Sequence, residues 1–158
     1  MVAYKVKKIK ILNFSDQFKI NKILFDCGKD MAKKYDLHHW DNSHIKNFAI
    51  IILCELKNTV YLVTDNGNPI ATFQTKQMGK TMHFQKLACS PKNSGKGIGS
   101  FCINCIEKIA KDANCEKVCM EVYSPSQHAL DFYLHRGYEV CGETKTIKYN
   151  EVKMEKIL

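Results

Sequence analysis

Apolar residues follow two different periods along the chain, and these periods predict where strands and helices form. Residues 3–12 alternate lysine with apolar side chains, which predicts a first strand. Residues 16–35 carry apolar side chains three and four positions apart, which predicts a helix. Residues 44–57 contain a run of β-branched isoleucines but keep helical spacing, so we expect a second helix there.

Turn signals divide the rest of the chain. Asn66 and Gly67 separate two strand-like runs, and an Asn-Gly pair in that position predicts a hairpin. A third antiparallel strand is expected at 81–89. A glycine-rich loop, a helix at 98–113 and a strand at 117–122 follow it, so the strands on either side of this helix are expected to be parallel. A last helix is expected at 127–136 and is ended by Gly137. Two last strands are expected at 138–144 and 147–156.

These elements predict an α/β (α+β) fold. The sheet is expected to be mixed and mainly antiparallel, with a central parallel strand pair and helices on both faces. The 158 residues contain no repeat and no Pro/Gly/Ser-rich linker, so we expect a single domain over residues 1–158. The start has no signal-peptide pattern, and the longest apolar run, residues 48–54, is far shorter than a membrane span. We therefore expect a cytoplasmic protein with no membrane partner.

The formal charge of +8 suggests an anionic partner. Arg136 is the only arginine, however, and bidentate reading of bases favours arginine over lysine. We therefore expect no specific nucleic-acid partner, while a weak attraction to phosphate stays open.

Eight cysteines raise the question of a metal site or a disulfide framework. Cys102 and Cys105 lie on the apolar stripe of the expected helix at 98–113, which favours small core residues over zinc ligands. The histidines of "HHWDNSH" (residues 38–44) lack ligand spacing on one helix face. We expect no metal.

The stretch "NSGKGIGSFC", residues 93–102, places three glycines in front of a helix. The first N–H groups of a helix lack partners and carry partial positive charge, so this loop predicts an anion site to which Lys96 adds a charge. A tight turn without a ligand is the alternative. The P-loop pattern fails because no Ser or Thr follows Lys96, and the strictly alternating glycines fit a dinucleotide-binding loop poorly.

Two segments together resemble the GNAT superfamily of acetyl-CoA-dependent N-acetyltransferases. These are "LACSPKNSGKGIGSFCINCIEKIA" and "VCMEVYSPSQHALDFYLHRGYEV", which match the loop motif Q/R-x-x-G-x-G/A and the later A-x-x-F-Y-x-x-x-G-F/Y pattern in the family's order and spacing. The resemblance covers roughly residues 81–145. It implies that the glycine loop binds the pyrophosphate of acetyl-CoA.

The resemblance also implies which residues contact acetyl-CoA. The backbone of 87–89 would hold the pantetheine arm, and 94–100 the pyrophosphate. The implied contacts are Leu87, Ala88, Cys89, Ser94, Gly95, Lys96, Gly97, Ile98, Gly99, Ser100, Ser126 and Phe132. Ser94 stands where the family commonly has Gln or Arg, and Ser126 where it commonly has Asn. These differences put one phosphate contact and one polar contact near the arm in doubt.

Acetyl transfer to an amine needs a base and an acid. An alkylammonium with a pKa of about 10.4 must lose a proton before it attacks, and the departing thiolate must gain one. The resemblance implies that Tyr133 is the general acid, although it also lies on an apolar stripe and packing is the alternative. Glu121 and His83 are the candidate bases, directly or through water. A backbone N–H of residues 87–89 is expected to polarise the carbonyl.

The expected function is transfer of an acetyl group from acetyl-CoA to a primary amine by direct attack in a ternary complex. By analogy with the family, the acceptor lies over residues 30–45, where Asp30, Asp36, Asp41 and Trp40 either bind an ammonium group or serve as surface and core. As the acceptor, a small-molecule amine and a peptide amine fit the sequence equally well. The protein is expected to be a monomer or a homodimer. The alternative function is a non-catalytic module that binds CoA or a macromolecule on the same fold.

Overall fold

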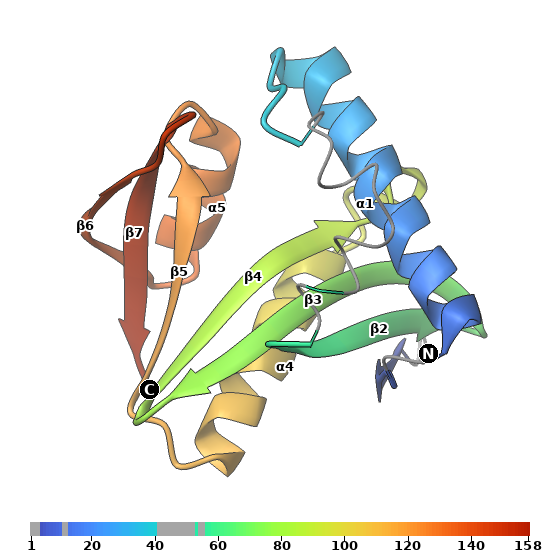
Figure 1. The fold of residues 1–158 in the computed structure, drawn as a ribbon, viewed down its shortest axis with the longest axis horizontal. Coiled ribbons are helices and arrows are strands. Elements are labelled where there is room, and N and C mark those ends of the chain that lie inside the picture. The colour runs from blue at the N-terminus through green and yellow to red at the C-terminus, as the bar shows by residue number, and fades with distance from the viewer. Residues whose placement is uncertain (1–3, 11–12, 41–52, 54–55) are drawn as a thin grey trace.

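The computed structural model describes residues 4–10, 13–40, 53 and 56–158, which form one seven-stranded sheet with helices on its faces (Figure 1). The strands are β1 (Tyr4–Lys8), β2 (Thr59–Asp65), β3 (Asn68–Met78), β4 (Thr81–Cys89), β5 (Lys117–Tyr123), β6 (Glu139–Lys145) and β7 (Asn150–Ile157). The helices are α1 (Phe14–Tyr35), α4 (Ile98–Asp112) and α5 (Gln127–His135), with a 3₁₀ turn η1 (Pro91–Asn93). The helix expected within 44–57 falls almost entirely outside the described residues.

The strand order is β1-β2-β3-β4-β5-β7-β6. Among these strands only β4 and β5 pair in parallel, so the mixed, mainly antiparallel sheet is confirmed. The last strand in the chain, β7, inserts between β5 and β6. Sequence patterns had predicted both final strands but not this order.

Helices cover both faces of the sheet, as expected. Ile20, Ile23 and Leu24 of α1 pack against one face. Cys102 and Ile106 of α4 are fully buried against the other, and α4 passes behind β3 and β4 in Figure 1. The expected role of Cys102 as a core residue is therefore confirmed.

Local hydrogen bonds explain where the observed boundaries differ from the expected ones. The expected first strand at 3–12 ends at Lys8, because the carbonyl of Lys10 already accepts the N–H of Asn13 at 2.8 Å in a turn. The helix α1 begins at Phe14 because the side chain of Asn13 accepts the N–H of Asp16 at 3.1 Å.

A bulge in β4 changes which face its last residues contact. Between Gln85 and Ala88, β4 has one residue more than the β3 segment opposite, and Lys86 adopts a left-handed φ of 50°. Phe84 packs on the α4 side, whereas Ala88 packs under α1 and Cys89 returns to the α4 side. Strict alternation would have placed Phe84 and Ala88 on the same face.

Trp40 packs back onto the middle of α1 at Gly28. A Cβ at Gly28 would lie 3.3 Å from the Cβ of Trp40, so this helical position admits glycine because another residue approaches closely. Trp40 joins the core under α1. This contact fixes the end of the segment that follows α1.

We expect the substitution Gly28→Leu to displace Trp40. The overpacking should lower the free energy of unfolding by about 1–3 kcal/mol. Trp40 is the only tryptophan, so its fluorescence should shift to longer wavelength as the indole becomes more exposed. The control Lys33→Leu, at an exposed position of the same helix, should change stability by less than about 0.5 kcal/mol. Equal emission and equal stability in the two variants would contradict the packing described here.

Candidate active site

β4 and β5 separate at the centre of the sheet. Their parallel pairing runs from Thr81 opposite Lys117 to His83 opposite Cys119 and then stops, and the two strands diverge in Figure 1. β4 continues to Cys89 without β5 beside it. Because Ser90 N–H donates to β3, alternation directs the N–H of Cys89 toward the open side.

The glycine loop lies at the end of this open edge. The N–H groups of residues 95–100 donate to no acceptor among the described residues. Gly95 and Gly97 have φ of 77° and 74°, and a Cβ at either would meet nothing within 4 Å. The Lys96 ammonium donates to the Asn93 side chain at 3.0 Å. The loop therefore offers a row of unpaired donors at a helix start, which suits an anion such as a pyrophosphate.

Other expected contact residues have structural roles that the loop geometry makes plain. A Cβ at Gly99 would lie 3.3 Å from the ring of Phe132, so this glycine allows α4 and α5 to approach. Ser94 is exposed and its N–H caps η1 by donating to Pro91. Ser126 is 3% exposed, and its carbonyl accepts the first hydrogen bonds of α5.

Tyr133 reaches the open edge from α5. Its ring centroid lies 6.0 Å from that of Phe84 and 5.8 Å from that of Tyr138. Burial raises the pKa of Tyr133 above its usual value, and the neighbouring thiols of Cys89 and Cys102 raise it further. The phenol therefore stays protonated across the physiological pH range and is available as a proton donor.

Thiols from three elements surround that hydroxyl. Burial raises the pKa of the Cys27 thiol to about 12, and the backbone N–H of Cys89 donates to its sulfur. The Cys102 thiol hydrogen-bonds to Cys89 and lowers the pKa of Cys89. The described cysteines form no disulfide. The surroundings of Tyr133 on this side are apolar and weakly polar.

His83 and Glu121 form a pair on the opposite face. His83 Nε2 donates to Glu121 Oε2 at 2.6 Å, and the two side chains are 17% and 23% exposed. The hydrogen bond from His83 lowers the pKa of Glu121 more than burial raises it. From the sequence alone, the face of the sheet on which each of these side chains lies could not be assigned. The structure brings the two candidate bases together in one unit.

Tyr133 and the His83–Glu121 pair therefore lie on different sides of the same opening. Phe84, which contacts Tyr133, faces α4, and its neighbour His83 faces the α1 side. A proton donor and a proton acceptor are separated by the gap between two strands. Such an arrangement suits a transfer reaction in which one group approaches from one face and another leaves toward the other.

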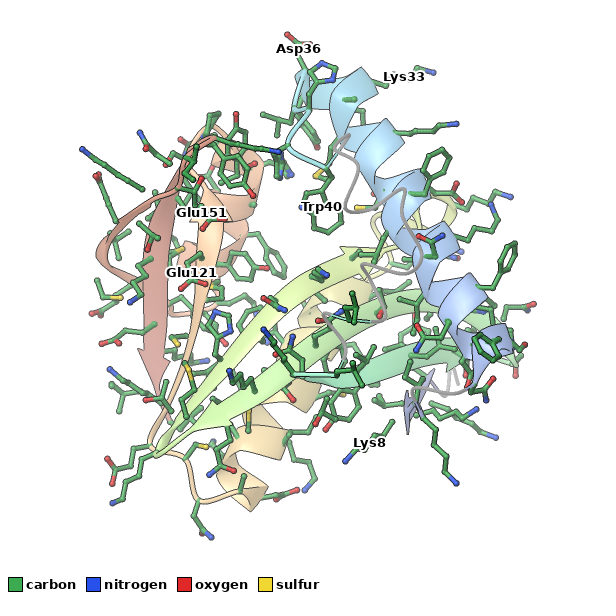
Figure 2. The ribbon with its side chains drawn as sticks, in the orientation of Figure 1. Lys8, Lys33, Asp36, Trp40, Glu121 and Glu151 are labelled. Atoms are coloured by element: carbon green, nitrogen blue, oxygen red, sulfur yellow. The ribbon has the colours of Figure 1, made fainter. Side chains whose placement is uncertain are left out.

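Sequence patterns missed a group of residues on the α1 side. The ring of His39 stacks on Tyr123 at 4.2 Å between centroids, and Tyr149 meets Tyr123 edge-on at 5.4 Å. Glu151 lies opposite Tyr123 in the β5–β7 pairing, and Figure 2 shows it above Glu121 on these strands. Only the register of β7 against β5, which no motif in the chain encodes, would have revealed this group.

The expected acceptor-binding acids have other partners. Asp30 pairs with Lys34 at 2.8 Å on α1, and Asp36 pairs with His38 at 2.8 Å on the exposed surface. Trp40 packs against the core under α1, and Asp41 lies outside the described residues. Among the described residues, no three His, Cys, Asp or Glu side chains gather closely enough to bind a metal.

The sheet opens at one parallel pair, and a helix start suited to an anion lies at the end of the opening. A match to a protein family identifies the class of protein that has this fold. Residues 20–138 match the model of the acetyltransferase (GNAT) family, and the chain belongs to this family. The resemblance found in the sequence is confirmed. None of the described helices has the length and apolar character needed to span a membrane.

The chain is similar to several known proteins over most of its length. The chain is 25% identical over 74% of its length to the uncharacterized protein YdhI of Bacillus subtilis (strain 168), of which the match covers 72%. It is 22% identical over 89% of its length to glucosamine 6-phosphate N-acetyltransferase of Candida albicans, of which the match covers 92%. The PaiA N-acetyltransferase of Thermoplasma acidophilum, solved with coenzyme A, has the same fold, with a TM-score of 0.78, 17% identity and 99% of each chain covered.

The His83–Glu121 pair predicts a measurable titration. The pKa of Glu121 is below 4.5 in the folded protein, so its ionised form adds stability above that pH, and this stability is lost as the pH falls through the lower native value. In His83→Leu, we expect this pKa to rise above 4.5, because burial then dominates. Lys153→Gln should raise it less, since Lys153 is the weakest of the groups that lower it. Carboxyl NMR against pH measures these values, and an unchanged pKa in His83→Leu would disprove the pairing.

Proposed function

We propose that this chain transfers the acetyl group of acetyl-CoA to a primary amine by direct attack in a ternary complex. The main support is that Tyr133 and the His83–Glu121 pair lie on opposite faces of the sheet where β4 and β5 separate. In this reaction the amine must lose a proton and the departing thiolate must gain one at nearly the same place. The geometry offers one group for each of these proton transfers.

The residues of the open edge fit acetyl-CoA. We assign the pyrophosphate to the loop from Ser94 to Ser100, where the N–H groups of 95–100 have no acceptor among the described residues and two glycines leave open space. The pantetheine arm would pair with the unpaired edge of residues 87–89, as a further strand would. Phe132 contacts Gly99 and would border the same site. Acetyl-CoA supplies the activated carbonyl.

The His83–Glu121 pair would deprotonate the acceptor. An alkylammonium with a pKa of about 10.4 is almost entirely protonated at neutral pH, so attack requires a group that takes its proton. The ionised Glu121 attracts the ammonium, and the hydrogen bond with His83 connects the two candidate bases. The freed amine nitrogen then attacks the thioester carbonyl carbon from the α1 side. The N–H of Leu87 would stabilise the negative charge that forms on the carbonyl oxygen, since the N–H of Cys89 already donates to the Cys27 sulfur.

Tyr133 would donate a proton to the departing sulfur. The carbon–sulfur bond breaks and leaves a thiolate, whose pKa in water is about 8.5. In water the phenol is the weaker acid, so this transfer is uphill, but burial also raises the pKa of the departing thiol and makes its thiolate a stronger proton acceptor beside Tyr133. Tyr133 and the His83–Glu121 pair lie on different faces. The proton given to the sulfur therefore need not be the proton taken from the amine.

A panel of amines tests the function. Acetyl-CoA is incubated with the protein and with alkylamines, amino sugars and peptides that carry a free N-terminus or lysine, and thiol release is measured. We expect turnover that depends on the amine. No turnover with any amine, together with tight binding of RNA or protein, would support the alternative, a non-catalytic module.

Removing the phenol hydroxyl should slow the reaction without loosening the cofactor. We expect Tyr133→Phe to lower kcat at least about tenfold, because general-acid catalysis contributes that much or more, while the Kd of acetyl-CoA changes little. Tyr138→Phe is the matched control. Tyr138 is a buried neighbouring tyrosine whose hydroxyl donates to Glu107, so its loss should affect stability and leave kcat nearly unchanged. An unchanged kcat in Tyr133→Phe would remove it from the mechanism.

Gly97, one of two glycines of the loop with a left-handed φ, gives a second prediction. Gly97→Ala and Gly67→Ala both place a Cβ in open space at φ of 74° and 83°, so both should lose about 1–2 kcal/mol of stability to backbone strain. Gly67 lies in the β2–β3 hairpin turn. We therefore expect only Gly97→Ala to weaken CoA binding, measured by calorimetry. Equal Kd values for the two variants would place the pyrophosphate elsewhere.

A further inference from the structure

Glu151 is an acidic residue that the proposed chemistry does not use. It lies on β7 opposite Tyr123, two register positions from the pair of Glu121 and Lys153, so these four side chains extend from the same face. Glu151 forms no ion pair with any described residue. Figure 2 shows Glu151 and Glu121 following one another along the strands that border the opening.

Two carboxylates and one histidine therefore face the α1 side together. Burial raises the pKa of Glu151, the negative charge of Glu121 raises it further, and His83 lowers it. Lys153, opposite Glu121 on β7, is exposed and forms no ion pair with either acid, although its charge lowers the pKa of Glu121. Within the described part of the chain, no cation is in ion-pair contact with Glu151.

Two tyrosines lie near Glu151, Tyr123 as its cross-strand partner and Tyr149 within reach of its charge. His39, Tyr123 and Tyr149 come from three different segments and contact one another. Burial raises the pKa of Tyr149, and the charge of Glu151 raises it further, so the two side chains lie close enough to interact. A partly buried carboxylate beside the faces of tyrosine rings is a suitable environment for an organic cation.

The reaction itself limits which cation this is. The nitrogen that attacks must be neutral at that moment, because its proton has passed to the His83–Glu121 pair. A second carboxylate kept for binding must therefore balance a different positive group on the same acceptor. The carboxylates would repel a phosphate group at this position. An acceptor such as glucosamine 6-phosphate, the substrate named for the Candida albicans relative, would therefore bind poorly here.

We propose that the acceptor is a dicationic amine, whose second, non-reacting ammonium group binds between Glu151 and the rings of Tyr123 and Tyr149. This inference rests on the proposed function. Glu151 is then a specificity residue, and it takes no part in proton transfer.

Steady-state kinetics with three acceptors test this inference. The probes are a linear alkyl diamine, the alkyl monoamine of the same chain length, and glucosamine 6-phosphate. We expect the wild type to have its lowest KM for the diamine and its poorest activity with the phosphate. In Glu151→Gln, the KM for the diamine should rise roughly fivefold to tenfold, the effect expected for one partly exposed ion pair, while its kcat and the KM for the monoamine stay unchanged.

Two further variants separate specificity from folding. Glu143→Gln, at an exposed position of β6, should leave all three acceptors unaffected. Glu151→Lys should make the monoamine preferred over the diamine, and CoA binding measured by calorimetry should show that each variant is folded. An equal KM for diamine and monoamine in the wild type, or an equal rise for both in Glu151→Gln, would overturn the inference alone. Absence of activity with every amine would overturn the proposed function as well.

Discussion

β4 and β5 hydrogen-bond only as far as His83 and Cys119, and the site depends on this short pairing. A bulge bends the strand that contains it, and the bulge of β4 at Lys86 follows soon after the last pair. The remainder of β4 has no strand beside it on its open side. An open strand edge can pair with a further extended chain, and the proposed partner is the amide-containing arm of acetyl-CoA. The glycine loop then begins where that edge ends.

The two faces at this opening differ in polarity. On the α4 side, Tyr133 lies among thiols and aromatic rings, where burial keeps the phenol protonated. On the α1 side, the His83–Glu121 pair keeps a carboxylate ionised. Burial would raise the pKa of both acidic groups, but only the carboxylate has a strong hydrogen-bond donor beside it. A single sheet thus holds a phenol and a carboxylate whose pKa values are moved in opposite directions.

Much of the cofactor half was predictable from the sequence, because it depends on local patterns. The Asn66–Gly67 hairpin, the helix at Ile98 and the glycine loop each follow from residues close together in the chain. The pairing of His83 with Glu121 was not predictable, since it depends on the phase of two distant strands. The bulge at Lys86 shows why: alternation fails there, and a lysine with positive φ gives no sequence signal.

The acceptor side was hidden for a related reason. Residues 20–138 match the family, whereas Tyr149 and Glu151 lie beyond that range. They reach the opening only because β7 inserts between β5 and β6, which sets Glu151 opposite Tyr123. A one-residue slip of β7 would turn Glu151 to the other face. In the proposed function, the family motifs would therefore specify how the acetyl donor is held, and the register of the last strand would decide which charges meet the acceptor.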